Sequence, residues 1–141
     1  MTAPRDTGVV GIRHRVRVEW IDTDAAGIYH NTAVVRFVEA AEAALMRERG
    51  LDGYFSSAPR VRYELDFESP LRFGQEATAV VEVVRIGTTS MTFAFELWGE
   101  PFDGRPRTRA AHGRFVTVHI DPHTGRSAPW PQPWLTALGV S

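Results

Sequence analysis

The chain of 141 residues contains neither cysteine nor lysine. Without cysteine it can form no disulfide, no thiol nucleophile and no cysteine-ligated metal site, and this composition fits a cytoplasmic protein. Without lysine, every basic side chain apart from histidine is an arginine. We attribute this bias to genomic base composition; the alternative is phosphate recognition, for which the planar guanidinium group is well suited.

The sequence also lacks a strong net charge and long apolar runs. A formal net charge of −1 gives no overall basic field that would attract nucleic acid or anionic lipid. No apolar run is long enough for a transmembrane helix or for the core of a signal peptide. We therefore expect a globular cytoplasmic protein with no nucleic-acid partner and no membrane partner.

Several common catalytic motifs are missing as well. The chain has no GxSxG nucleophile elbow, no GxGxxG or P-loop phosphate cradle, and no HExxH metal motif. His119, Asp121 and His123 bracket a predicted strand end and a proline turn. These three side chains could hold a metal ion, but a surface turn is the simpler interpretation. We expect neither a metal nor a cofactor.

The pattern of apolar residues predicts one domain of the α+β class that spans residues 1–141. Helical spacing of Val34, Phe37, Val38, Ala41 and Leu45 predicts one long helix that ends near Gly50. Alternating or Val-rich patterns predict strands at 13–20, 60–68, 75–86, 89–98 and 108–120. Short loops between the last four strands favour an antiparallel sheet around the helix, and residues 1–11 are expected to form a loose arm.

The polar residues of greatest interest lie in the stretch from Trp20 to Gly50. Asp22 and Asp24 fall in a turn that Gly27 can close by adopting a positive φ. Asp24 is interpretable as an ordinary turn or N-cap residue. It is equally interpretable as a general base or nucleophile beside a helix N-terminus, where unpaired N–H groups favour negative charge.

Three further polar side chains follow Asp24. His30 and Asn31 are expected in the first helical turn, with His30 on the apolar face and therefore pointing inward. Glu39 lies in the middle of the helix, where it is either solvated or paired with Arg36 at i,i+3. Each of these signals has a structural explanation as well as a catalytic one.

The stretch DTDAAGIYHNTAVVRFVEAAE closely resembles the signature of the 4-hydroxybenzoyl-CoA thioesterase-like family of hot-dog-fold proteins. The segments Asp66–Phe67 with Pro70–Gly74, and Arg85–Gly87 with Thr89–Phe93, resemble later parts of the same family more weakly. The residues that match the signature are Asp22, Asp24, Gly27, Ile28, Asn31 and Glu39.

The resemblance implies a hot-dog fold, in which an antiparallel sheet curls around a central helix. It implies a homodimer or homotetramer with active sites at the dimer interface, and hydrolysis of an acyl-CoA thioester. Two alternatives stay open: release of a product from an acyl-carrier protein, and a non-catalytic module that binds acyl-CoA. The sequence leaves the acyl group open between an aryl, a short-chain and a medium-chain group.

The resemblance also assigns roles to residues of this chain. Asp24 matches the catalytic carboxylate, and the backbone N–H groups near Gly27 and Ile28 would polarise the thioester carbonyl. His30 and Asn31 would have supporting roles, and Glu39 would orient water or the Asp24 region. Gly87 to Thr89 lack the basic run that meets the CoA nucleotide in the 4-hydroxybenzoyl-CoA enzyme. Substrate binding is therefore assigned to Arg60, Arg62, Arg85, Gly87, Thr88 and Ser90, with Arg126 as a further candidate.

Overall fold

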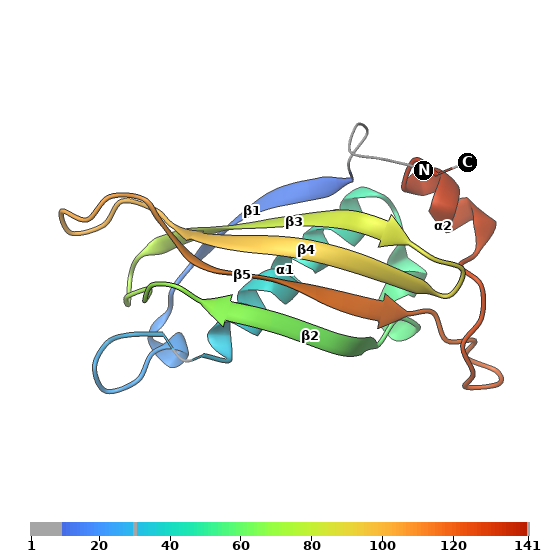
Figure 1. Ribbon diagram of the computed structural model, residues 1–141, viewed down its shortest axis with the longest axis horizontal. Helices are drawn as coiled ribbons and strands as arrows, with labels where there is room; N and C mark the ends of the chain where they lie inside the picture. The colour runs from blue at the N-terminus through green and yellow to red at the C-terminus, as the bar shows by residue number, and fades with distance from the viewer. Residues whose placement is uncertain (1–9, 30, 141) are drawn as a thin grey trace.

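The computed structural model describes residues 10–29 and 31–140 (Figure 1). A short 3-10 turn η1 (Trp20–Asp22) precedes the long helix, and a second one, η2 (Asp52–Ser56), follows it. A short helix lies near the C-terminus. The strands and helices are β1 (Gly11–Arg17), α1 (Ala33–Glu48), β2 (Arg60–Phe67), β3 (Glu76–Ile86), β4 (Ser90–Gly99), β5 (Thr108–Val118) and α2 (Gln132–Ala137).

The five strands form one antiparallel sheet in the order β1-β3-β4-β5-β2. Strands that follow one another from β3 to β5 are neighbours, as short connections favour. β1 and β2 flank α1 in the sequence but lie at opposite edges of the sheet (Figure 1). This arrangement confirms the predicted α+β class and the predicted antiparallel sheet, although β2 and β3 are not neighbours.

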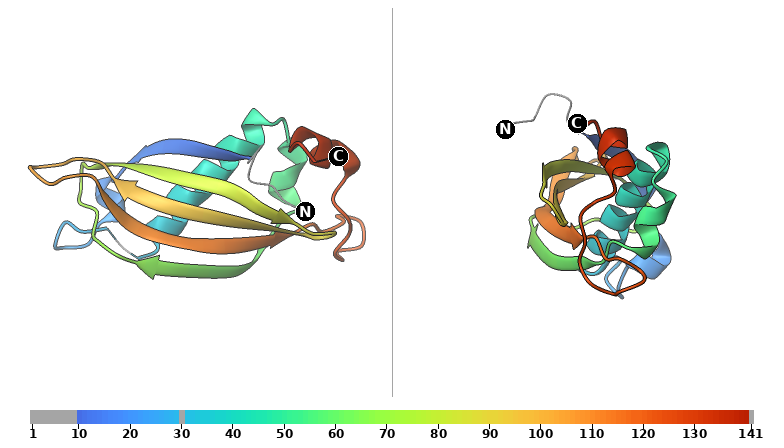
Figure 2. Two further views of the ribbon diagram at one scale, coloured as in Figure 1. Left: turned by 45° about the horizontal axis from the view of Figure 1, so that its top comes forward. Right: turned by 90° about the vertical axis from the view of Figure 1, so that its right-hand side faces the viewer.

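Helix α1 fills the concave side of the curved sheet, as the end-on view in Figure 2 shows. It packs against β1, β3, β4 and η2. The apolar stripe predicted from helical spacing is buried in full, from Val34 through Phe37 to Leu45. Since burial of large apolar side chains is the main favourable contribution to folding, this stripe fixes the helix against the sheet.

The sheet contributes an aromatic row that extends this core. Phe93 on β4 pairs with Phe115 on β5, and their rings stack with centroids 4.5 Å apart. Tyr63 on β2 pairs with Phe115 from the other side, and those centroids are 5.5 Å apart. The alternating pattern of β4 is confirmed, because Met91, Phe93, Phe95 and Leu97 are all buried.

Element ends differ from the predictions at three places. Helix α1 begins at Ala33, so Asn31 lies in a turn before it and not in its first turn. Trp20, expected on the buried face of the first strand, lies in η1 and is 77% exposed. Residues 10 and 11 are not part of a loose arm, because Val10 is buried and Gly11 pairs with Glu82.

The C-terminal segment covers the end of the domain that is opposite the β4–β5 hairpin. The rings of Trp130 and Trp134 pack against Tyr54 of η2 and against His119. Trp130 Nε1 donates a hydrogen bond to the Ser90 carbonyl at 3.1 Å. In the part of the chain that the structure describes, no helix is long and apolar enough to cross a membrane.

Candidate active site

Asp24 lies in a tight turn that projects from one end of the domain. Its N–H donates to the Ile28 carbonyl at 2.9 Å, and its carbonyl accepts the Gly27 N–H at 3.0 Å. Its side-chain Oδ1 accepts the Ala26 N–H at 2.8 Å, which is an Asx turn. Gly27 adopts a φ of 76°, as the turn requires. The Asp24 side chain is exposed, so a substrate can reach it.

A short ladder of backbone hydrogen bonds attaches this turn to the loop between β2 and β3. The Tyr29 N–H donates to the Leu71 carbonyl at 2.9 Å, and the Phe73 N–H donates to the Gly27 carbonyl at 3.1 Å. Ile28 and Arg72 are therefore paired in antiparallel fashion. The ladder holds Asp24 in a defined place although neither segment belongs to a regular strand.

A buried carboxylate holds the other side of the turn. Asp22 is only 4% exposed, and its two oxygens accept hydrogen bonds from Arg36 Nε at 2.9 Å and Arg36 Nη2 at 2.6 Å. Asp22 Oδ2 also accepts the Glu19 N–H at 2.8 Å. This pairing joins η1 to α1, so Asp22 has a structural role and its neighbour Asp24 remains the exposed carboxylate.

The two predicted backbone donors differ in their hydrogen bonding. The Gly27 N–H is engaged with the Asp24 carbonyl. Within residues 10–29 and 31–140, the Ile28 N–H has no hydrogen-bond acceptor. The expectation that both groups lie at the start of the helix is wrong, since α1 begins at Ala33. Of the two, only the Ile28 N–H therefore lacks an acceptor among the described residues.

The other predicted catalytic residues are spread along and before α1. Asn31 is exposed in the turn that precedes the helix, and His30 lies outside the described residues. Glu39 projects from the middle of α1 with its side chain 47% exposed. It pairs with Arg60 Nη1 at 3.4 Å, whereas Arg36, its expected partner, is bound to Asp22.

Most of the predicted substrate-binding residues lie at the end of the domain that is opposite the Asp24 turn. The β3–β4 hairpin, which carries Gly87, Thr88 and Ser90, is at the right of Figure 1, whereas the Asp24 turn is at the left. Arg85 is exposed on β3 near that hairpin, and Arg62 is exposed on β2, where it pairs with Glu64. A single chain does not bring these residues to Asp24 (Figure 1).

Comparison with known proteins assigns the chain to a family. Residues 18–138 match the sequence profile of the thioesterase-like superfamily. The chain belongs to this superfamily. A 1,4-dihydroxy-2-naphthoyl-CoA hydrolase from Thermosynechococcus vestitus is 27% identical over 127 residues, which cover 84% of each chain.

Solved thioesterase structures share the fold. A 1,4-dihydroxy-2-naphthoyl-CoA thioesterase from Synechocystis superposes with a TM-score of 0.79 at 20% identity, over 92% of this chain and 96% of that one. A mutant 4-hydroxybenzoyl-CoA thioesterase bound to 4-hydroxybenzoyl-CoA gives a TM-score of 0.80 at 16% identity, over 92% and 99% of the two chains. These findings confirm the predicted hot-dog fold, the family and the enzyme class, thioester hydrolase.

The thioesterase also contains a buried polar cluster that the sequence analysis missed. Glu42 on α1 is 3% exposed and binds Arg60 of β2. Tyr54 of η2 donates its hydroxyl hydrogen to Glu42 Oε2 at 2.5 Å, and Thr117 Oγ1 lies 3.2 Å from the same hydroxyl. Burial raises the pKa of Glu42, while hydrogen bonds from Tyr54 and the charge of Arg60 oppose that rise.

A pattern in the sequence could have identified Glu42. It follows Val38 by four residues and precedes Leu45 by three, so it lies on the apolar stripe of α1. A carboxylate on a buried stripe requires partners, because an unpaired buried charge is costly. Its partners, Tyr54 and Arg60, come from η2 and β2, and no local sequence pattern indicates them. Arg60 is therefore engaged in the core of the thioesterase.

Replacing Glu42 tests this buried cluster through the pH dependence of stability. The raised pKa means that the folded state holds the Glu42 proton more tightly than the unfolded chain does. This contribution favours folding at low pH and is lost as pH rises through the folded-state pKa. Glu42→Gln removes it, so the free energy of unfolding of the variant should rise relative to wild type as pH increases above about 4.5, the ordinary pKa of the carboxyl group.

Urea denaturation of both proteins across that pH range measures the difference. Glu48→Gln, at an exposed position of α1, serves as the control for the loss of one negative charge. A difference between Glu42→Gln and wild type that stays constant with pH, or that falls as pH rises, would contradict the assignment.

Proposed function

We propose that the thioesterase hydrolyses acyl-CoA thioesters in the cytoplasm and that Asp24 is its catalytic carboxylate. The observation that carries this proposal is the exposed Asp24 side chain, held in a turn by backbone contacts on both sides. One carboxylate oxygen accepts the Ala26 N–H, and within the described residues Oδ2 has no partner. That oxygen can attack a carbonyl carbon or take a proton from water.

A thioester needs little further assistance from the protein. In the nucleophilic route, an Asp24 oxygen bonds to the acyl carbon, the thiolate leaves, and water then hydrolyses the anhydride. In the general-base route, Asp24 takes a proton from the attacking water, and the thiolate again leaves. A donor aimed at the developing oxyanion lowers the barrier of either route. The Ile28 N–H, which has no acceptor among the described residues, is the donor that we assign to this task.

The proposed acyl group is a hydroxylated aromatic ring. The sequence relative is a 1,4-dihydroxy-2-naphthoyl-CoA hydrolase, and a solved structure of the same fold binds 4-hydroxybenzoyl-CoA. Tyr29 follows the turn, and its buried hydroxyl has no hydrogen-bond partner within residues 10–29 and 31–140. Burial raises the pKa of Tyr29 to about 12, so this hydroxyl is a neutral donor and acceptor at physiological pH. A hydroxyl group on the substrate would satisfy it once substrate binding opens a path to this buried atom.

The proposed active unit is a homodimer formed by the edges of β2. Val61 and Phe67 of this edge strand are 61% and 47% exposed, and the outer main chain of an edge strand is available for pairing. The opposite edge strand, β1, carries Arg13, Arg15 and Arg17, which disfavour such pairing.

This dimer would bring the predicted substrate-binding residues of one subunit close to Asp24 of the other. Two β2 strands that pair antiparallel about a two-fold axis place the Arg60 end of one strand at the Phe67 end of the other. The Phe67 end leads directly into the loop that holds the Asp24 turn. The partner would thereby bring its β3–β4 hairpin toward Asp24.

Replacing Asp24 tests the catalytic proposal. We expect Asp24→Asn to lower kcat for thiol release from 4-hydroxybenzoyl-CoA by at least about 100-fold, because the amide is neither a base nor a nucleophile. Its oxygen can still accept the Ala26 N–H, so the turn should persist.

The assay follows thiol release from 4-hydroxybenzoyl-CoA, benzoyl-CoA and a medium-chain acyl-CoA, with Asp52→Asn at a remote exposed position as the control. We expect the hydroxylated substrate to give the highest kcat/KM with wild type and Asp52→Asn to resemble wild type. Full activity of folded Asp24→Asn would refute the mechanism.

Replacing Phe67 tests the dimer. Phe67→Glu places a third carboxylate between Asp66 and Glu68, and two such edges would repel one another across the axis. We expect sedimentation to show a shift from dimer to monomer and thiol release to fall with it. Val140→Glu, at a partly exposed residue near α2, should leave both unchanged. A dimeric and fully active Phe67→Glu protein would show that this edge is not the interface.

A further inference from the structure

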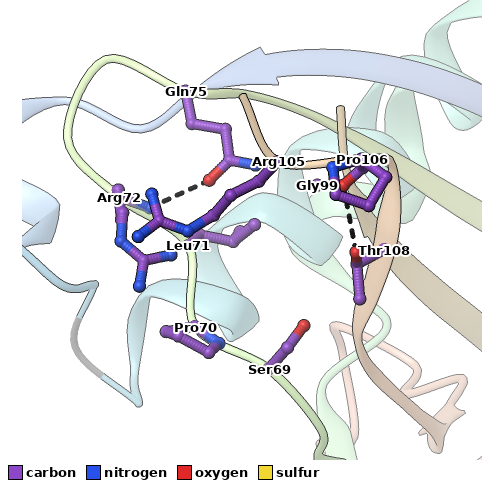
Figure 3. A pocket seen from close by; sticks show the side chains of 9 residues that line it. All are labelled: Ser69, Pro70, Leu71, Arg72, Gln75, Gly99, Arg105, Pro106 and Thr108. Atoms are coloured by element: carbon purple, nitrogen blue, oxygen red, sulfur yellow. Dashed lines mark hydrogen bonds between the residues drawn. The ribbon is translucent and has the colours of Figure 1, made fainter. Parts of the chain in front are cut away.

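A hollow lies between the β2–β3 loop, which pairs with the Asp24 turn, and the base of the β4–β5 hairpin (Figure 3). Its volume is about 230 Å³. Leu71 and Gln75 form part of its floor and are buried. In Figure 3 the side chains of Arg72 and Arg105 converge from two different loops over the hollow.

The two guanidinium groups lack strong counter-ions within residues 10–29 and 31–140. The Arg72 side chain makes no hydrogen bond or ion pair there. Arg105 has only Asp103, at 3.9 Å, and that carboxylate is 81% exposed, so the pair contributes little. Two cations that converge without an anion between them repel one another, which favours the binding of an anion.

Neighbouring carboxylates are already occupied by other basic groups. Glu100 accepts hydrogen bonds from Arg107 at 3.0 Å and from Thr78 at 2.5 Å. Glu68 accepts hydrogen bonds from Arg109 at 2.7 Å, and these contacts lower its pKa. These acids are therefore not available to neutralise Arg72 or Arg105.

The hollow is connected to the candidate catalytic turn through the main chain. Arg72 is paired directly with Ile28, and the Leu71 carbonyl accepts the Tyr29 N–H. A group bound over Arg72 would therefore lie next to the segment that closes the Asp24 turn. Gln75 fixes the loop, since its Oε1 accepts the Arg72 N–H at 3.0 Å and its Nε2 donates to the Glu100 carbonyl at 2.9 Å.

We propose that Arg72 and Arg105 bind a phosphate group of the thioester substrate in this hollow. The proposal rests on the proposed function, which supplies a substrate with a pantetheine arm linked to phosphate. The guanidinium fork matches phosphate oxygens and forms paired charge-assisted hydrogen bonds with them. The phosphate belongs either to phosphopantetheine itself or to the nucleotide part of CoA.

The size of the hollow limits what it can hold. Pockets that enclose a drug-sized molecule measure roughly 300–1,000 Å³. At about 230 Å³ the hollow accommodates one small anionic group but not a whole nucleotide. The remainder of a CoA molecule would extend over the surface or toward the partner subunit.

The kinetic test compares three thioesters of one acyl group: acyl-pantetheine without phosphate, acyl-phosphopantetheine and acyl-CoA. The variants are Arg72→Gln and Arg105→Gln, which lie on separate loops, so that a folding defect in one does not decide the result. Arg47→Gln, near the end of α1, is the matched control. We expect KM for acyl-CoA to rise about tenfold in each variant, with kcat and KM for acyl-pantetheine unchanged.

The three substrates also identify the phosphate. A rise in KM for both phosphorylated substrates supports contact with the phosphate next to pantetheine. A rise for acyl-CoA alone supports contact with the nucleotide phosphates. An equal rise for acyl-pantetheine, or no rise for any substrate, overturns the proposal.

A binding measurement separates this proposal from the proposed activity. Calorimetry with inorganic pyrophosphate should show affinity for wild type that falls at least threefold in Arg72→Gln and stays unchanged in Arg47→Gln. If wild type cleaves no thioester but binds pyrophosphate through Arg72, the activity is wrong and the anion site stands. Equal binding of pyrophosphate by wild type and Arg72→Gln overturns the anion site.

Discussion

The candidate site depends on the backbone pairing between residues 27–29 and 71–73. Two loops that are distant in sequence would each lose much conformational entropy on ordering, and main-chain hydrogen bonds between them offset part of that loss. The pairing attaches the Asp24 turn to the loop that carries Arg72, and Arg72 lines the hollow. Because the bonds involve main-chain atoms, the geometry of the turn does not require the Asp24 charge. A substitution that removes the Asp24 charge can therefore abolish the reaction and leave the turn intact.

The carboxylates of and after the Asp24 turn fall into two groups, those bound by an arginine and those left free to react. Asp22 and Glu42 are buried and each is held by an arginine, so they join elements of the fold. Asp24 is exposed, and its contacts leave one carboxylate oxygen free within the described residues. Arginine is the only strongly basic residue type in the chain, so an arginine can either hold the fold together or bind a ligand. The partners of each arginine in the structure distinguish these two roles.

The sequence predicts the elements better than it predicts the contacts of the site. Helical spacing from Val34 to Leu45 and the alternation in β4 were sufficient because burial imposes period 3.6 or period 2. The start of α1 was placed too early, since the segment around Ile28 is held by the β2–β3 loop and not by helical bonds. The Glu42 cluster and the Arg72–Arg105 hollow depend on pairings between distant segments, which one sequence does not reveal.

A crystal structure of the Asp24→Asn variant with bound 4-hydroxybenzoyl-CoA tests the central claim most directly. The account predicts that the thioester carbonyl carbon lies within about 3.5 Å of the side chain at position 24, as a near-attack geometry requires. The carbonyl oxygen should face the Ile28 N–H, and a phosphate group should contact Arg72 or Arg105. A thioester bound away from the turn, with the side chain at position 24 exposed to solvent, would contradict it.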